Sequence, residues 1–171
     1  MRSLYRRMGE IAGRSKMAPL LLMVGVAGGC SIGAPSTFTL NSASVDESYV
    51  CPTSANDLSY TIHATLGVHN GTSAGVTIRS IAVVMTLASV KGGWLEHIGD
   101  TYDAAGVTVS PDTVNAGSDA SLKLKIPSAC TNGKLPSAGS SYGEYSVAFT
   151  VVTSSGTHTI LSQNRHRIVA A

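Results

Sequence analysis

The side chains best suited to chemistry in this chain are three cysteines and five histidines. A thiolate can act as a nucleophile or bind a metal ion, and an imidazole can bind a metal ion or transfer a proton. Serine, histidine and aspartate occur too often for a catalytic triad to be chosen from their positions. Glu96, Asp100 and Asp103 lie in one short segment, where a solvated acidic loop is the commoner arrangement. We therefore expect no catalytic residue and no enzymatic activity.

Four of the histidines lie in segments that are expected to be strands. His63 and His69 share one face of a strand, and their spacing of six residues separates them by about 20 Å. This pair cannot share a metal ion, because ligands must converge to within about 2 Å of it. His158 and His166 can approach one another across a hairpin, but no cysteine or methionine nearby completes a copper site. We expect solvent-exposed histidines, no metal ion and no cofactor.

Residues 1–29 have the composition of a signal peptide. Residues 1–16 are basic, and residues 17–29 form an apolar run of 13 residues. A stable transmembrane helix needs about 20 residues, so this run is too short to span a bilayer. It has the length of a signal-peptide core, and small residues close it at Ala27, Gly28 and Gly29. Residues 1–29 are therefore predicted to direct export.

The sequence Val26-Ala27-Gly28-Gly29-Cys30 resembles the lipobox of bacterial lipoproteins. The resemblance implies that the Cys30 thiol is acylated, for example with palmitate, and that residues 30–36 tether the protein to a membrane of the cell envelope. Ser31 then implies the outer membrane or the cell surface. Ala27 replaces the leucine that the family prefers, and it also fits an ordinary signal-peptidase site. Free secretion is therefore the alternative, and an uncleaved anchor is a second one.

Cys51 and Cys130 are left over when Cys30 serves for attachment. We expect them to form a disulfide bond, because oxidation is the default outside the cytoplasm. The bond would close a loop of about 80 residues, for which the chain-entropy model gives about 4–5 kcal/mol. Cys51 precedes one strand pattern and Cys130 follows another, so the bond is expected to join loops or edges rather than the two sheets. Two buried free thiols are the alternative.

The charge of the chain argues against binding to nucleic acid. Charged residues make up 13% of the sequence, roughly half of the ~25% that is usual in soluble domains. From Cys30 onward there are seven basic and nine acidic residues, a net charge of −2. A face that holds phosphates needs clustered lysine and arginine side chains. Nucleic acid is therefore not an expected partner.

Alternation of apolar and polar residues is the clearest structural pattern in the sequence. From Leu58 to His69 the apolar residues all fall on one face, which predicts a strand with a period of two residues. Asn70-Gly71 then predicts a turn. The next segment, from Val76, changes phase around Arg79-Ser80, which predicts a β-bulge. Continuous burial on both faces is the alternative.

The remaining strand patterns are shorter and closely spaced. They are expected near Phe38–Leu40, at Val107–Val109, at Leu122–Ile126 with an end at Pro127, at Tyr145–Val151, and at about Thr157–Val169 after a hairpin turn. No segment has convincing helical periodicity. About seven short strands predict an all-β fold, a single antiparallel Ig-like β-sandwich over residues 37–171.

Three short motifs carry a resemblance to bacterial Ig-like and fibronectin-type modules. They are Leu66-Gly67-Val68-His69-Asn70-Gly71, Ala116-Gly117-Ser118 and Tyr145-Ser146-Val147. Similar pieces end a long strand, precede a lysine-flanked strand and begin a closing hairpin in those modules. The resemblance implies the same sandwich, but it names no subfamily and no ligand.

The segment Lys91–Gly106 is the best candidate for contact with a partner. It contains Trp94, the only tryptophan, together with His97 and Tyr102. End loops of sandwiches often carry recognition, and tryptophan and tyrosine are enriched at the strongest interface positions. The alternative is that Trp94 and Leu95 fold back to cap the core. We expect a non-catalytic binding or structural module, whose partner beyond the membrane is another envelope protein or a glycan. An envelope enzyme or metal carrier is the least expected class.

Overall fold

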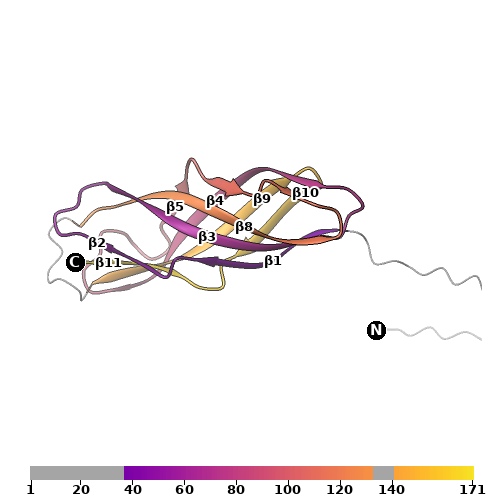
Figure 1. Cartoon of the computed structure of the whole chain (residues 1–171). Helices are drawn as coiled ribbons and strands as arrows, with labels where there is room; N and C mark the ends of the chain where they lie inside the picture. The colour runs from indigo at the N-terminus through magenta and orange to yellow at the C-terminus, as the bar shows by residue number, and fades with distance from the viewer. Residues whose placement is uncertain (1–36, 133–140) are drawn as a thin grey trace, which may run out of the picture. The chain divides into compact units, whose positions relative to one another are not determined.

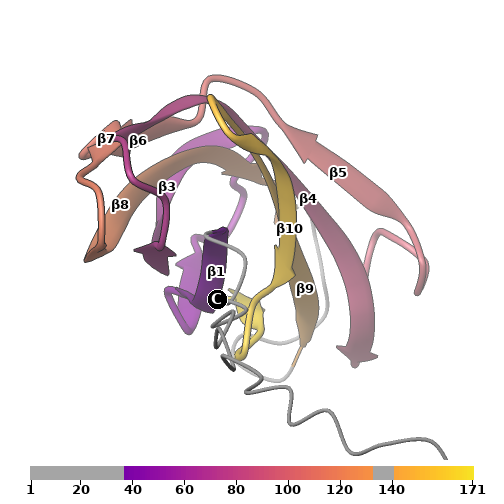
Figure 2. The ribbon, with the colours of Figure 1, turned by 90° about the vertical axis from the view of Figure 1, so that its right-hand side faces the viewer.

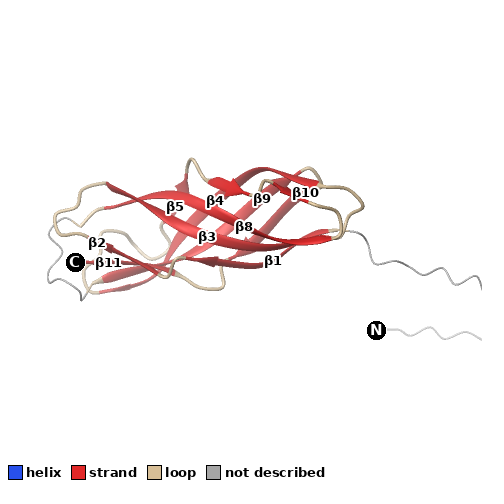
Figure 3. Cartoon of the chain, in the orientation of Figure 1, coloured by secondary structure: helices blue, strands red, loops and turns tan. Residues whose placement is uncertain are grey.

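The computed structural model describes residues 37–132 and 141–171, which belong to one compact unit. These residues form β-strands without a helix (Figure 3), so none of them lies in a helix that could span a membrane. The strands are β1 (Phe38–Val45), β2 (Ser48–Cys51), β3 (Leu58–Asn70), β4 (Val76–Lys91), β5 (Thr101–Ala104), β6 (Thr108–Ser110), β7 (Thr113–Val114), β8 (Ser118–Cys130), β9 (Tyr142–Thr153), β10 (Gly156–Leu161) and β11 (His166–Ala170). The signal peptide, Cys30 and the tether lie outside the described residues and stay predictions.

The strands form two sheets that face one another (Figures 1 and 2). One sheet has the order β1-β3-β8-β6, and the other has the order β2-β11-β9-β4-β5, with β10 also beside β9. Ig-like sandwiches have strands A-B-E-D in one sheet and C-F-G in the other. The first order corresponds to A-B-E-D, and β4, β9 and the β10–β11 pair correspond to C, F and G. The predicted Ig-like sandwich is therefore confirmed.

Apolar residues on the inner faces of both sheets build the core. In β3 the predicted alternation holds from Ile62 to Val68, whose apolar residues are buried while the polar residues between them face outward. In β9 every second residue is buried over its whole length. The largest side chains with almost no exposure include Phe149, Ile62, Leu66, Met85, Leu87, Leu122 and Leu124.

The predicted bulge in β4 is present. The pairing of β4 with β9 shifts register between Ile78 and Ser80. Arg79 and Ser80 are exposed, which excludes burial on both faces. Because the extra residue lies at the bulge, the apolar residues before and after it face the same core. These buried residues are Val76, Ile78, Val83, Met85 and Leu87.

The described residues form eleven strand segments, more than the seven or so that the sequence predicted. Two of the extra segments are β5, which lies within the segment Lys91–Gly106 that was expected to be a loop, and β7. The other two arise because the first and last strands are interrupted. The first strand changes sheets at Asp46, since β1 pairs with β3 and β2 pairs in parallel with β11. The last strand is broken between Leu161 and His166. There the Asn164 side-chain amide donates to the carbonyl oxygen of Val45 at 2.7 Å, and its oxygen accepts from the Val45 N–H at 3.0 Å. Asn164 therefore joins the edges of the two sheets.

The expected end of a strand at Pro127 was wrong, because β8 continues to Cys130. A proline lacks the N–H that a central strand would use, so it is tolerated only where one edge is open. The neighbouring strand β6 pairs with residues 123–125 of β8 and no further. The part of β8 around Pro127 is therefore an edge, and this edge borders the cavity described below.

The disulfide bond between Cys51 and Cys130 is confirmed, with the two Cα atoms 6.0 Å apart. Cys51 ends β2 in one sheet, and Cys130 ends β8 in the other. The bond therefore joins the edges of the two sheets. The expectation that it joins edges was right, and the expectation that it does not link the two sheets was wrong. The cause is the change of sheet between β1 and β2, which local alternation of apolar residues does not reveal.

Candidate functional site

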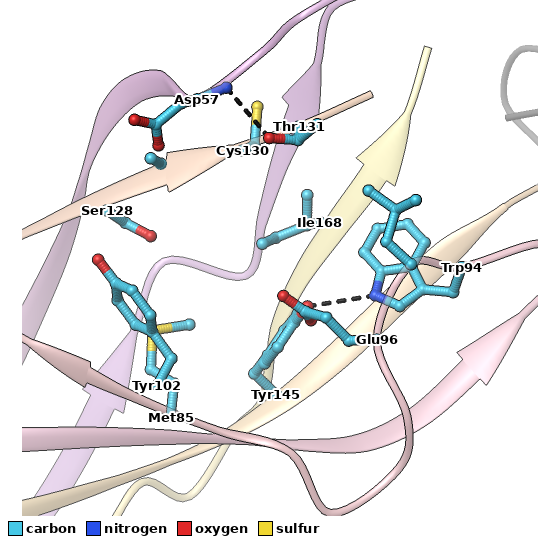
Figure 4. Close-up of a pocket in the computed structure, with 12 residues that line it drawn as sticks. Asp57, Met85, Trp94, Glu96, Tyr102, Ser128, Cys130, Thr131, Tyr145 and Ile168 are labelled. Carbon is cyan, nitrogen blue, oxygen red and sulfur yellow. Dashed lines mark hydrogen bonds between the residues drawn. The ribbon is translucent and has the colours of Figure 1, made fainter. Parts of the chain in front are cut away.

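A cavity of about 350 Å³ opens between the sheets, beside the free edge of β8 (Figure 4). Its walls come from both sheets and from the segment between β4 and β5. We call this cavity the candidate pocket. It is lined by Asp57, Met85, Trp94, Leu95, Glu96, Tyr102, Ser128, Ala129, Cys130, Thr131, Tyr145 and Ile168.

A chain of hydrogen bonds forms one wall of the pocket (Figure 4). The Trp94 indole N–H donates to the Tyr145 hydroxyl oxygen at 3.2 Å, and the Tyr145 hydroxyl donates to the Glu96 carboxylate. Burial, and then the hydrogen bond to Glu96, raise the pKa of Tyr145, whose side chain is only 5% exposed. The phenol is therefore protonated at neutral pH, so it can donate to the carboxylate.

Trp94 turns back onto the sandwich and is half-buried. Its ring covers Gly143 so closely that a Cβ atom placed there would lie 2.6 Å from the ring. Trp94 therefore caps this end of the core, as one of the two interpretations of the sequence expected. The next residue, Leu95, does not fold back onto the core and is 55% exposed.

Ser128, which lines the pocket, also belongs to a polar network with Tyr60 and His166, which do not line it. Burial raises the pKa of Tyr60 to about 12, and a hydrogen bond with Ser128 opposes the rise. The Tyr60 hydroxyl lies 3.2 Å from Nε2 of His166, and Nδ1 of His166 lies 2.7 Å from the carbonyl oxygen of Asp46. Because that carbonyl can only accept, Nδ1 carries the proton and Nε2 accepts from Tyr60. Burial lowers the pKa of His166, which favours this neutral form.

Two carboxylates, from Asp57 and Glu96, are the charged groups that line the pocket within the described part of the chain. Asp57 follows the turn before β3 and has a positive φ of 52°, a backbone conformation that aspartate tolerates better than most residues. Its backbone N–H donates to the Thr131 hydroxyl at 3.0 Å. The pocket therefore combines a negative charge with aromatic and apolar walls.

The segment between β4 and β5 has a defined conformation, and it exposes apolar side chains. The N–H of His97 donates to the Asp100 carboxylate at 2.7 Å, and the N–H of Asp100 donates to the His97 carbonyl at 2.9 Å. The His97 side chain points to solvent. Leu95 and Tyr102 line the pocket and are exposed, and Ile98 between them in the sequence is 64% exposed. We call residues 94–102 the contact loop.

The histidines have different environments. His63 and His69 are exposed on the outer face, each beside an aspartate. His158 is half-buried against the ring of Phe38. His166 is 1% exposed, so the expectation of a solvent-exposed side chain was wrong for this residue. In β11 the even-numbered residues face the core, so His166 lies on the same buried face as Ile168.

In residues 37–132 and 141–171 no group of three or more histidine, cysteine, aspartate or glutamate side chains is placed to hold a metal ion.

A short motif that the sequence reasoning overlooked also has a structural explanation. Residues 71–75 read Gly-Thr-Ser-Ala-Gly, which fits the G-x-S-x-G pattern of some serine hydrolases. In those enzymes the serine lies on a sharp turn from a strand into a helix. Here the segment is the turn between two strands, β3 and β4. It therefore lacks the local structure that would activate Ser73. A second match, at residues 139–143, lies partly outside the described residues.

Several residues of the pocket were not predicted from the sequence. Met85 and Ile168 fall on core faces of their strands, and nothing nearby in the sequence indicates that the core opens there. Asp57 and Ser128 are ordinary polar residues near strand ends. These four side chains line one cavity because β8 and the segment before β3 belong to one side of the sandwich, and β4 and β11 belong to the other. No local pattern could have identified them.

Comparisons with known proteins give no close match. No protein-family model matches the chain, and no curated protein matches it. Among solved structures, it is similar to AggA, the major subunit of aggregative adherence fimbriae type I from Escherichia coli, with 8% identity, a TM-score of 0.35, and coverage of 79% of this chain and 96% of that one. The PapD-like domain 7 of human CEP192 has 13% identity, a TM-score of 0.32, and coverage of 90% and 98%. The CooA pilin subunit of enterotoxigenic Escherichia coli has 14% identity, a TM-score of 0.28, and coverage of 77% and 99%. Because these TM-scores are low, the fold assignment rests on the strand order.

Proposed function

We propose that this chain is a lipid-anchored protein of the bacterial cell envelope. In this proposal its β-sandwich is a non-catalytic binding module that faces away from the membrane. Cys30 is the attachment residue, and the contact loop with the candidate pocket is the binding surface. The lipobox-like sequence before Cys30 supports the anchor, and the position of the pocket in the sandwich supports the binding role.

The observation that carries this proposal is that the chain enters the sandwich at the start of β1 (Figure 1), whereas the pocket lies at the other end of β3. The Gly71 N–H donates to the Thr37 carbonyl oxygen at 2.9 Å. The next residue, Phe38, pairs with Asn70 at the end of β3. Cys130, in the pocket wall, pairs with Leu58 at the start of β3. A strand of 13 residues spans about 40 Å. An anchor at Cys30 would therefore hold the entry end near the membrane and leave the pocket free.

The composition of the contact loop supports a binding role. Exposed apolar side chains that cluster around a cavity are typical of interaction sites. Leu95 and Tyr102 line the pocket and are exposed, and Ile98 is exposed in the same loop. In the described residues the pocket holds no histidine, and its one cysteine, Cys130, is oxidised in the disulfide bond. This combination favours recognition over nucleophilic catalysis.

The anchor is tested by intact mass spectrometry, without reduction, of protein from membrane and culture-fluid fractions of a bacterium that processes lipoproteins. We expect a membrane-bound species that starts at Cys30 and carries added acyl mass. The Cys30→Ser variant should lose this mass and leave the membrane fraction, whereas the neighbouring Ser31→Ala variant should keep both. An unacylated wild-type protein in the culture fluid would refute the anchor and favour a freely secreted binding module.

A further inference from the structure

The charge of the candidate pocket indicates which kind of ligand it can accept. Asp57 and Glu96 contribute two carboxylates, and the described lining residues include no basic side chain. No salt bridge within the described residues involves either acid. A pocket with this charge repels anions and attracts a cation. Asp57 lies just before β3 and Glu96 lies between β4 and β5, so two separate loops bring the acids to the cavity.

The Glu96 carboxylate is held in place before any ligand arrives. Tyr145 donates to one of its oxygens, and Trp94 donates in turn to the Tyr145 hydroxyl. This leaves the other carboxylate oxygen without a hydrogen bond to the described residues. A hydrogen-bonded chain of this kind orients the acceptor, so less conformational entropy is lost on binding. The second oxygen can therefore accept from an N–H donor in the cavity.

The walls and floor of the pocket suit an organic cation rather than a bare metal ion. Trp94, Tyr102 and Tyr145 bring aromatic rings to the cavity, and a cation placed over such a ring is attracted by its electrons. Met85 and Ile168 provide an apolar floor between the polar walls (Figure 4). The volume of about 350 Å³ lies at the lower end of the ~300–1,000 Å³ range of small-molecule sites.

We propose that the candidate pocket binds a primary alkylammonium group, with the ammonium at the Glu96 carboxylate, the Asp57 carboxylate adding to the negative charge of the cavity, and the methylene chain against Met85 and Ile168. This inference rests on the proposed function, because it names the ligand class of the same binding surface. A carboxylate or phosphate ligand is disfavoured by the two acids.

Trp94 offers a direct measurement, since it is the only tryptophan of the chain and lines the pocket. The purified full chain in detergent is titrated with hexylammonium, with 1-hexanol and with hexanoate, while tryptophan fluorescence is recorded. One ion pair and one cation–aromatic contact together favour the ammonium over the alcohol by about tenfold in Kd. We expect saturable binding of hexylammonium, binding of hexanol about tenfold weaker, and no response to hexanoate. Equal affinity for hexylammonium and hexanol would overturn the proposal.

Charge-removing variants of nearly equal shape locate the site. Glu96→Gln and Asp57→Asn should each weaken hexylammonium binding by about three- to tenfold and leave hexanol binding unchanged. Asp103→Asn is the matched control, because Asp103 lies next to Tyr102 on β5 but does not line the pocket. If all three variants have the same affinity as the wild type, the ammonium does not bind here. Near-ultraviolet circular dichroism checks that each variant is folded.

A further arm of the titration distinguishes the two sources of an alkylammonium group. Nα-acetyl-lysine amide carries the group of a lysine side chain, whereas hexylammonium represents a free amine. Tighter binding of the lysine derivative assigns the site to a protein partner, and tighter binding of the free amine assigns it to a small metabolite. If neither binds more tightly than hexanol, the ligand class is wrong. Acylation and membrane association are measured separately, so that result would leave the proposed anchor untouched.

Discussion

Replacement of Gly143 by alanine tests how Trp94 is held at the pocket. Gly143 lies in β9, where its backbone pairs with Val90 on one side and Ile168 on the other. A Cβ atom at this position would lie 2.6–2.8 Å from atoms of the Trp94 ring. The strand cannot shift because it is paired on both sides, so the ring must move.

The expected cost follows from the contacts that the ring makes. Moving Trp94 breaks its hydrogen bond to Tyr145, which contributes about 0.5–1.5 kcal/mol. Exposure of part of the half-buried ring adds to this loss at about 25 cal/mol per Å². Alanine restricts the unfolded chain more than glycine does, which stabilises the folded state by about 0.4–1 kcal/mol and opposes both effects. We expect Gly143→Ala to lower the free energy of unfolding by about 1–2 kcal/mol.

The measurement combines urea unfolding with the emission maximum of Trp94. Gly143→Ala should lower the midpoint of unfolding and shift the emission to longer wavelength, because the indole becomes more exposed. Gly75→Ala is the matched control, since a Cβ atom at Gly75 would make only ordinary contacts, the closest at 3.9 Å. If both variants have the stability and emission of the wild type, Trp94 does not pack on Gly143.

Three more predictions concern the stability of the sandwich. Asn164→Ala should lower the free energy of unfolding in urea by about 1–3 kcal/mol, because it removes two hydrogen bonds that join the sheet edges. As a control, Asn41→Ala at an exposed position should change this free energy by less than about 0.5 kcal/mol. Burial holds the pKa of His166 below its ordinary value of 6.5, so the unfolded chain binds the proton more readily. Stability should therefore be fully present above pH 6.5 and fall as the pH drops below it, by at most about 1.4 kcal/mol per pH unit. His166→Gln should flatten this dependence between pH 7.5 and pH 5, and an unchanged slope would contradict the assignment. Replacing Cys51 and Cys130 together by alanine should lower stability by about 4–5 kcal/mol relative to the oxidised protein, and an equal midpoint for the two would show that the bond contributes nothing.

The sequence predicted the parts of the fold that local backbone geometry controls. In a strand successive side chains point to opposite faces, so alternation from Leu58 to His69 identified both the strand and its buried face. The same reasoning located the bulge at Arg79, because a one-residue insertion changes the phase of the pattern. The cysteine count, together with the predicted export signal, identified the disulfide pair. Each of these inferences needs only residues that are neighbours in the chain or a rule about cellular compartments.

The tertiary structure decided which strands are neighbours, and with them the disulfide's role, the buried histidine and the pocket. Pro127 interrupts a local strand pattern, yet β8 continues through it because no strand pairs with that edge. His166 is polar, yet the core accepts it because Tyr60 and the Asp46 carbonyl satisfy both ring nitrogens. Asp57 and Glu96 are far apart in the sequence, yet both line the same cavity. The sequence therefore determined the strands and their faces, whereas the order of the strands determined where the core stays open, because pairing depends on the whole chain.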